Sequence, residues 1–166
     1  MSRGFVKEED QEEAPMIPPR AALPDGAINY VTPLGMQQLL DERALLETQK
    51  LELSPDDETE HRRDTAVLNG KLNLLQERII SARILDPADQ AKDVVRFGAK
   101  VTYKMLANKK IHTFQIVGVD EADIKKDKIA FVAPIAVAIT GSKVCDIVDF
   151  QLGKEIRKIE ILEIRY

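Results

Sequence analysis

Residues 68–82 read LNGKLNLLQERIISA, and apolar side chains recur in this stretch at intervals of four, three, four and three residues. They are Leu68, Leu72, Leu75, Ile79 and Ala82. This spacing is the seam of a coiled-coil helix, which needs an apolar partner. The preceding segment offers one, because Leu39, Leu46 and Leu53 recur every seven residues.

The start of each helix is marked by a capping residue close to a proline. Thr32-Pro33 suits an N-cap followed by the first helical position, where the missing N–H of proline costs nothing. Ser54-Pro55-Asp56-Asp57 repeats the signal, with Ser54 and Asp57 at the spacing of a capping box. We expect the first helix over residues 33–53 and the end of the second before Pro87, which disfavours helical geometry at its predecessor. Because the link is short, residues 32–86 should form an antiparallel hairpin with an apolar base and a charged tip.

Beyond Pro87 the hydrophobic period changes from 3.6 to 2, which is typical of strands. We expect short strands at 101–105, 114–116 and 129–132, and a closing hairpin of 147–152 with 156–164. A helical turn is expected over 134–139. The predicted fold class is α+β, with the antiparallel helical hairpin followed by a compact antiparallel β-sheet domain over residues 87–166.

Residues 1–31 are predicted to be an acidic, proline-rich flexible arm. They hold three basic and six acidic side chains and four prolines, with few large apolar groups. Such a segment buries too little surface to offset the entropy of ordering it. The alternative is a docking segment anchored by Phe5, Val6, Met16 and Ile17.

Composition excludes several classes of site. The 166 residues are 44% hydrophobic and 31% charged, with one cysteine and two histidines. A disulfide framework, a cysteine-based zinc site and a catalytic triad are therefore not supported, and no glycine-rich nucleotide motif occurs. Cys145, at the start of a predicted strand, is expected to be a small buried hydrophobe. The N-terminus turns acidic at once, unlike a signal peptide, and no apolar run is long enough for a bilayer, so a soluble cytoplasmic protein is expected.

Charge divides the chain unevenly. Residues 32–86 carry seven basic and eleven acidic side chains, whereas residues 87–166 carry fourteen basic and eleven acidic ones. The asymmetry suggests two units with different partners. The basic excess of the second half is far from a nucleic-acid-binding stripe.

The order of several motifs resembles the Gre family of bacterial transcription elongation factors. Phe97-Gly98-Ala99-Lys100-Val101-Thr102 is followed by the stretch IVGVDEAD at 116–123, by APIA at 133–136 and by the closing ILEIRY at 161–166. Thr32-Pro33-Leu34-Gly35-Met36 is similar to the family's opening of the first helix. The resemblance covers residues 30–166.

This resemblance implies a function. An FKBP-like C-terminal domain would dock on core RNA polymerase at the rim of its secondary channel, and the coiled coil would enter that channel. Acidic residues at the tip would hold a Mg²⁺ ion beside the polymerase's own metal, where a backtracked transcript is hydrolysed. The protein would then be an accessory factor and not an enzyme, with no tightly bound cofactor, contact with transcript RNA or DNA inside the complex, and no membrane partner.

Asp57 and Glu60 keep the family's D-x-x-E interval at the tip, with Asp56 and Glu58 beside them. Carboxylate oxygens suit Mg²⁺, so Asp57 and Glu60 are the candidate metal ligands. His61 stands where the family has Asn, and the hairpin looks shorter than the family's by roughly two helical turns, about 10 Å. The alternative is that these acids only cap the helix and complement its dipole.

Two further groups of residues are assigned through the resemblance. The candidates for docking on the polymerase are Asp120, Glu121, Asp123, Pro134 and Ile135. The alternative makes Asp120 to Asp123 a turn between strands and Ile135 a core residue. The candidates for facing nucleic acid are Arg62, Arg63, Lys125 and Lys126. Solvated lysines, and arginines paired with acids at (i, i+4) spacing, are the alternative.

Three functions stay open at this point. The protein could stimulate transcript cleavage, occupy the polymerase channel without cleavage, or be a polymerase-binding module similar to the nucleoside diphosphate kinase regulator. The length of the hairpin and the position of its acids discriminate among them.

Overall fold

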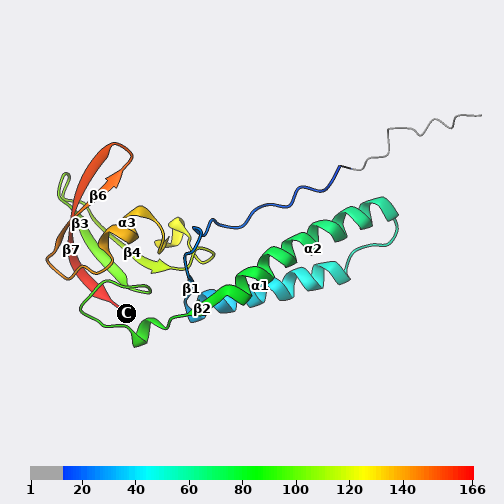
Figure 1. Cartoon of the computed structure of the whole chain (residues 1–166), viewed down its shortest axis with the longest axis horizontal. Helices are drawn as coiled ribbons and strands as arrows, with labels where there is room; N and C mark the ends of the chain where they lie inside the picture. The colour runs from blue at the N-terminus through cyan, green and yellow to red at the C-terminus, as the bar shows by residue number, and fades with distance from the viewer. Residues whose placement is uncertain (1–12) are drawn as a thin grey trace, which may run out of the picture.

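The computed structural model describes residues 13–166, in which a helical hairpin projects from one end of a β-sheet domain (Figure 1). The predicted anchors Phe5 and Val6 lie outside the described residues. In chain order the elements are β1 (Asn29–Val31), α1 (Pro33–Leu51), α2 (Glu58–Ser81), β2 (Ala82–Ile84), η1 (Pro87–Asp89), β3 (Lys100–Met105), β4 (Ile111–Val117), η2 (Ile124–Lys126), β5 (Lys128–Ala130), α3 (Pro134–Ile139), β6 (Ile147–Leu152) and β7 (Glu155–Arg165). The α+β fold class is confirmed.

The hairpin forms along the predicted leucine seam. Thr32 is the N-cap of α1, and its hydroxyl accepts a hydrogen bond from the Gly35 amide at 2.9 Å. The side chains buried between the two helices and the strand before them are Val31, Leu39, Leu46, Leu68 and Leu75. Heptad spacing on both helices therefore places one apolar stripe against the other.

The turn between the helices differs from the prediction. The first helix ends at Leu51, two residues early, and the N-cap of α2 is Asp57 and not Ser54. The Asp57 carboxylate accepts from the amides of Thr59 and Glu60 at 2.9 and 3.1 Å. The Ser54 hydroxyl instead donates to Asp56 at 2.7 Å. Ser54 is therefore part of the turn, and Asp57 caps the helix.

The base of the hairpin is closed by a two-stranded parallel sheet that the sequence analysis missed. Strand β1 pairs with β2, in a register from Asn29↔Ala82 to Val31↔Ile84. Because Ala82 begins strand β2, helix α2 ends at Ser81, several residues before the end predicted from Pro87. The boundary predicted for the arm at residue 31 also differs from the structure, because Asn29 and Val31 are buried.

The β-sheet domain has the strand order β5-β4-β3-β7-β6. All pairs are antiparallel except β4 with β5, which is parallel and runs from Gln115↔Lys128 to Val117↔Ala130. The prediction of an antiparallel sheet is wrong for this pair, because residues 118–127 carry the chain back past the end of β4 before β5 begins. The core side chains include Val95, Val101, Phe114, Ile116, Ile139, Phe150, Ile159 and Ile161.

Cys145 is exposed, with φ of 72°, and its amide donates to the Ile161 carbonyl at 2.8 Å. The expectation of a buried thiol is therefore wrong. Its left-handed backbone lies in the turn just before β6. Among residues 13–166, no helix has the length and hydropathy needed to cross a membrane.

The hairpin base and the β-sheet domain are in direct contact. The ring of Tyr30 on β1 lies 5.8 Å from that of Phe97 and 5.7 Å from that of Phe131, centroid to centroid. At Gly118, just after β4, a Cβ atom would lie 2.7 Å from the Tyr30 carbonyl oxygen. Glycine is required here because backbone meets backbone.

We therefore expect Gly118→Ala to destabilise the protein by about 1–3 kcal/mol, since the added methyl must push strand β1 away from the sheet domain. Urea unfolding followed by circular dichroism measures this. A variant as stable as the parent would show that the two parts do not pack as described.

Candidate functional site

The hairpin ends in an acidic tip that lies at the end away from the β-sheet domain (Figure 1). The tip consists of four exposed side chains, Asp56, Asp57, Glu58 and Glu60. One oxygen of Asp57 is engaged as the helix cap, whereas no hydrogen bond from a described residue reaches its Oδ2 or the carboxylate of Glu60. Acids in the first turn also complement the helix dipole. Asp57 can therefore cap the helix with one oxygen while other carboxylate oxygens at the tip stay free of hydrogen bonds from the described residues.

The tip carboxylates do not form a self-contained metal site. Within residues 13–166, no group of three or more His, Cys, Asp or Glu side chains is close enough to hold a metal ion. Magnesium, however, is commonly held by one or two carboxylates together with waters and groups from a partner. That Asp57 and Glu60 supply such carboxylates stays a prediction.

The basic residues beside the tip are exposed and unpaired with acids of the described chain. Arg62 and Arg63 follow the acids on α2, and no ion pair to either is present within residues 13–166. The (i, i+4) pairing considered for Glu58 and Arg62 is therefore absent. His61 turns back to the loop, with Nδ1 3.1 Å from the Ser54 carbonyl oxygen.

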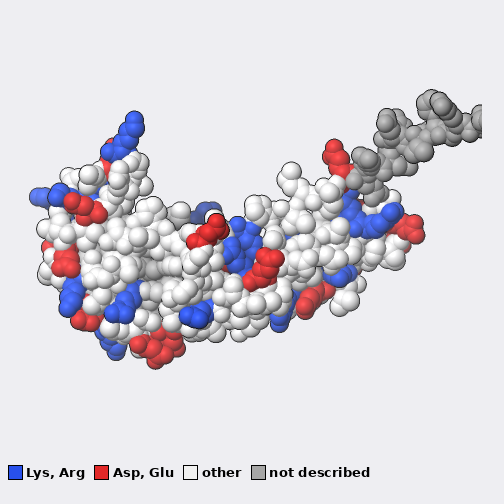
Figure 2. Space-filling view, viewed as in Figure 1, with Lys and Arg blue, Asp and Glu red and all other residues white. Residues whose placement is uncertain are grey.

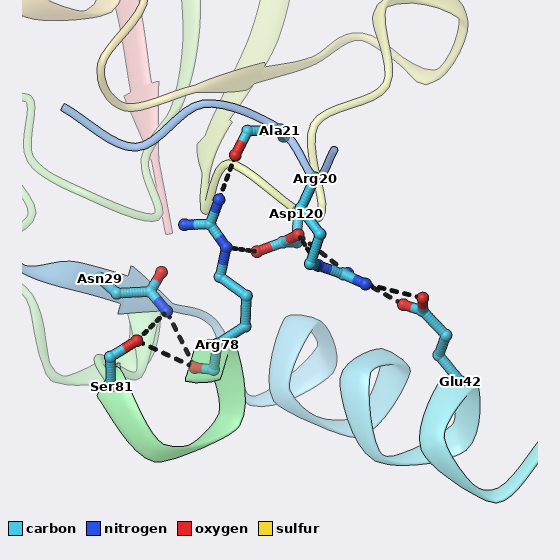
Figure 3. A network of polar contacts seen from close by, with 7 residues as sticks. All are labelled: Arg20, Ala21, Asn29, Glu42, Arg78, Ser81 and Asp120. Atoms are coloured by element: carbon cyan, nitrogen blue, oxygen red, sulfur yellow. Dashed lines mark hydrogen bonds and ion pairs between the residues drawn. The ribbon is translucent and has the colours of Figure 1, made fainter. Parts of the chain in front are cut away.

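Asp120 lies inside the molecule and not on a docking surface. Its side chain is only 8% exposed and accepts from Arg20 Nε at 2.9 Å, while Arg78 Nε lies 3.4 Å from its other oxygen (Figure 3). Arg20 also donates to both oxygens of Glu42, at 2.8 and 3.0 Å. Arg20, Arg78, Glu42 and Asp120 come from the N-terminal segment, α2, α1 and the loop after β4; we call them the junction network.

Glu121 is likewise internal, with a side chain only 3% exposed. It accepts from the Thr32 hydroxyl and from Lys128 Nζ, the latter at 2.8 Å. A Cβ on Gly35 would lie 2.7 Å from its carboxylate, so glycine lets the first turn of α1 approach. The assignment of Asp120 and Glu121 to docking is not supported, because both carboxylates are used to hold the hairpin on the β-sheet domain.

The remaining docking candidates differ in exposure. Asp123 is partly exposed and caps η2, accepting from the Lys125 amide at 3.0 Å. Pro134 is exposed at the start of α3, whereas Ile135 is half-buried and packs against the core. Of these three candidates Pro134 is therefore the most exposed, whereas Asp123 and Ile135 are both partly buried.

The two lysines of η2 are solvated. Lys125 and Lys126 are exposed, and Lys126 pairs with Asp123 at 3.7 Å. Figure 2 shows Lys and Arg interspersed with Asp and Glu over the visible face of both parts. That face carries no stripe of one sign, as the sequence predicts.

Sequence reasoning missed Arg20, Arg78 and Glu42. Arg20 and Asp120 are 100 residues apart, and a single arginine in a proline-rich segment gives no sign of a partner. The hydrogen bond with Glu42 raises the pKa of Arg20 above its ordinary value, against the opposing effect of burial, so the guanidinium remains charged.

Comparison with protein families places the second half of the chain. Residues 90–166 match the family described as "Transcription elongation factor, GreA/GreB, C-term". The GreA protein of Neisseria meningitidis serogroup A is 36% identical over 100 residues, which are 60% of this chain and 63% of that protein. The chain thus spans slightly less than two thirds of that relative. The GreA protein of Neorickettsia sennetsu is 35% identical over 108 residues, 64% of this chain and 68% of that protein.

Two solved structures also align with this chain at low similarity. The GreA factor homolog 1 (Gfh1) of Thermus thermophilus aligns with a TM-score of 0.40 at 18% identity, over 84% of this chain and 100% of that one. The GreA/GreB factor of Nitrosomonas europaea aligns with a TM-score of 0.41 at 19% identity, over 84% of this chain and 99% of that one.

The roles of the neighbouring acids can be separated by substitution. We expect Glu121→Gln to destabilise the protein by about 2 kcal/mol, because Lys128 loses a buried charged partner. Asp123→Asn, which keeps a capping oxygen at a partly exposed site, should change stability by less than about 0.5 kcal/mol. Urea unfolding of both variants checks the ranking, and equal effects would contradict the internal role of Glu121.

Proposed function

Because the chain belongs to the GreA/GreB family of transcription elongation factors, we propose that it binds core RNA polymerase and modulates transcript elongation. The observation that carries this proposal is the match of residues 90–166, almost the whole β-sheet domain, to the family's C-terminal region. The hairpin that precedes it presents four acids at the far end. The chain would act as an accessory factor in the cytoplasm, with the chemistry belonging to the polymerase.

The division of labour follows from the two parts. The β-sheet domain would dock on the polymerase through the exposed surface that includes Asp123 and Pro134 at the starts of η2 and α3. The hairpin, joined to it through buried contacts, would project into the secondary channel. Arg62 and Arg63, exposed next to the acids, would meet phosphates of the transcript or DNA.

At the tip, Asp57 and Glu60 are the residues proposed to hold Mg²⁺, with Asp56 and Glu58 adding negative charge nearby. When bound beside the polymerase's own metal, such an ion supplies activation of water and stabilisation of the leaving oxygen. Cleavage of a backtracked transcript is the activity that this arrangement would support. The tip carboxylates need only bind and orient the cation.

A non-cleaving regulator that occupies the channel is the second candidate. It is favoured by the engagement of Asp57 as helix cap, which leaves one of its oxygens for a cation. The two helices of 19 and 24 residues span about 28 and 36 Å, and a hairpin shorter than the family's, as the resemblance implies, would also favour this candidate. The two candidates share the partner and differ only in what the tip does.

We expect Asp57→Asn combined with Glu60→Gln to abolish transcript cleavage while leaving polymerase affinity within about twofold. Asparagine keeps the capping oxygen, so α2 should persist while the anionic oxygens that a hard cation needs are lost. Cleavage by stalled elongation complexes, measured against Mg²⁺ concentration, reports the effect.

The matched control is Asp41→Asn combined with Glu77→Gln, two exposed acids on the shafts of α1 and α2. It removes the same charge away from the tip and should leave cleavage unchanged. A parent protein that alters elongation but never stimulates cleavage would support the channel-occupying candidate. A parent that neither binds nor affects the polymerase would refute both.

The docking surface can be tested at Pro134. We expect Pro134→Asp to weaken binding to core polymerase about tenfold, because it places a charge in the proposed interface. Aspartate is acceptable at the first position of a helix, whereas a charge at half-buried Ile135 would disturb the core. Lys154→Asp, in the exposed β6–β7 turn, is the control. Equal affinities for both variants would place the docking surface elsewhere.

A further inference from the structure

The N-terminal segment lies back along the hairpin from its base, over α2 (Figure 1). Two side chains fasten it there. Ile17 lies against Gly70 in the middle of α2, and Arg20 joins the junction network. Arg78 of α2 also donates to the Ala21 carbonyl, so the contact continues along the backbone. We call residues 15–21 the strap.

Gly70 is fitted to the strap. A Cβ atom at this position would overlap the Cδ1 atom of Ile17. Glycine inside a helix costs about 0.5–1 kcal/mol relative to alanine, and nothing in the coiled-coil seam requires it, since the seam residues flank it at Leu68 and Leu72. The close approach of Ile17 is the contact that explains a glycine here.

Arg20 connects three elements through the two ends of its guanidinium. One side meets Asp120 of the β-sheet domain, and the other meets both oxygens of Glu42 on α1 (Figure 3). The Arg20 side chain is 17% exposed and that of Asp120 is 8% exposed. A planar fork with five donors suits such a bidentate bridge, and lysine could not reproduce it.

The position of this bridge gives it leverage. The other contacts between the two parts lie near the hairpin base: Tyr30 with Phe97 and Phe131, Thr32 with Glu121, and Arg78 with Asp120. Glu42 lies ten residues along α1 from Thr32, about 15 Å from the base. A tie fixed farther from a pivot opposes rotation more effectively than one fixed at the pivot.

We propose that the strap is a detachable brace that sets the direction of the hairpin relative to the β-sheet domain. With Arg20 and Ile17 in place, the hairpin has one orientation and the acidic tip one position. When the strap lifts, the contacts at the base remain but the hairpin swings about them. This property belongs to the chain itself and does not depend on the partner proposed above.

The single native cysteine makes the proposal measurable in the full chain. Cys145 is exposed on the β-sheet domain, and Thr59→Cys adds a second exposed thiol at the tip. Spin labels on both report the distribution of distances between the two parts. We expect one narrow distribution in this labelled parent and a roughly twofold broader one after Arg20→Gln. The control Arg96→Gln, an exposed arginine with no ion pair among the described residues, should leave it narrow.

Gly70→Ala provides an independent test, because this variant should remain folded and a broader distance distribution could not be attributed to unfolding. Alanine favours the helix yet displaces Ile17, so α2 should be at least as helical while the distance distribution broadens. Circular dichroism confirms the fold of each variant. Narrow distributions in both Arg20→Gln and Gly70→Ala would overturn the proposal, as would an Arg20→Gln variant that unfolds alongside a narrow Gly70→Ala.

Discussion

Two adjacent carboxylates, Asp120 and Glu121, are buried in the loop after β4. The groups that bind them hold the N-terminal segment and the hairpin against the β-sheet domain. A buried charge is tolerated only when it is paired and hydrogen-bonded. None of the positive groups that meet Asp120 comes from the β-sheet domain, since Arg20 belongs to the N-terminal segment and Arg78 to α2. Glu121 is held by Thr32, which at the same time caps α1, and by Lys128 of the sheet. The buried carboxylates of this loop in the β-sheet domain thus have all of these partners only when the N-terminal segment and the hairpin pack against it.

These buried contacts fix the orientation of the hairpin relative to the β-sheet domain, and that orientation sets the position of the acidic tip. The acids at the tip are solvated, with the Asp57 cap as their main link to the backbone. They gain no special chemistry from burial or from a surrounding network. Under the proposed function, the position of these acids would be set by the junction network at the opposite end of the hairpin.

The sequence predicts the elements of this fold far better than the contacts between them. Repeating leucines such as Leu39 and Leu46 reveal the hairpin because a seam is a local pattern, and alternation does the same for β3 and β7. The strand at Asn29–Val31 is too short to show a period, and its partner lies beyond both helices. The acids lie in the turn because each flanking helix shows its own local pattern, although the N-cap of α2 is Asp57 and not Ser54. The burial of Asp120 could not be predicted, because its partner Arg20 is 100 residues away and no local pattern indicates the contact.

The seam between α1 and α2 also bears on how such a protein can change over evolutionary time. Among the described residues, the hydrogen bonds of the turn at Ser54, Asp56, Asp57 and His61 are all local, and the junction network lies toward the other end of the hairpin. Seven residues inserted in each helix near the turn would continue the same seam and leave the junction untouched. Each such insertion would extend the hairpin by about 10 Å. Reach can therefore vary among related chains in discrete steps, under selection separate from that acting on the base.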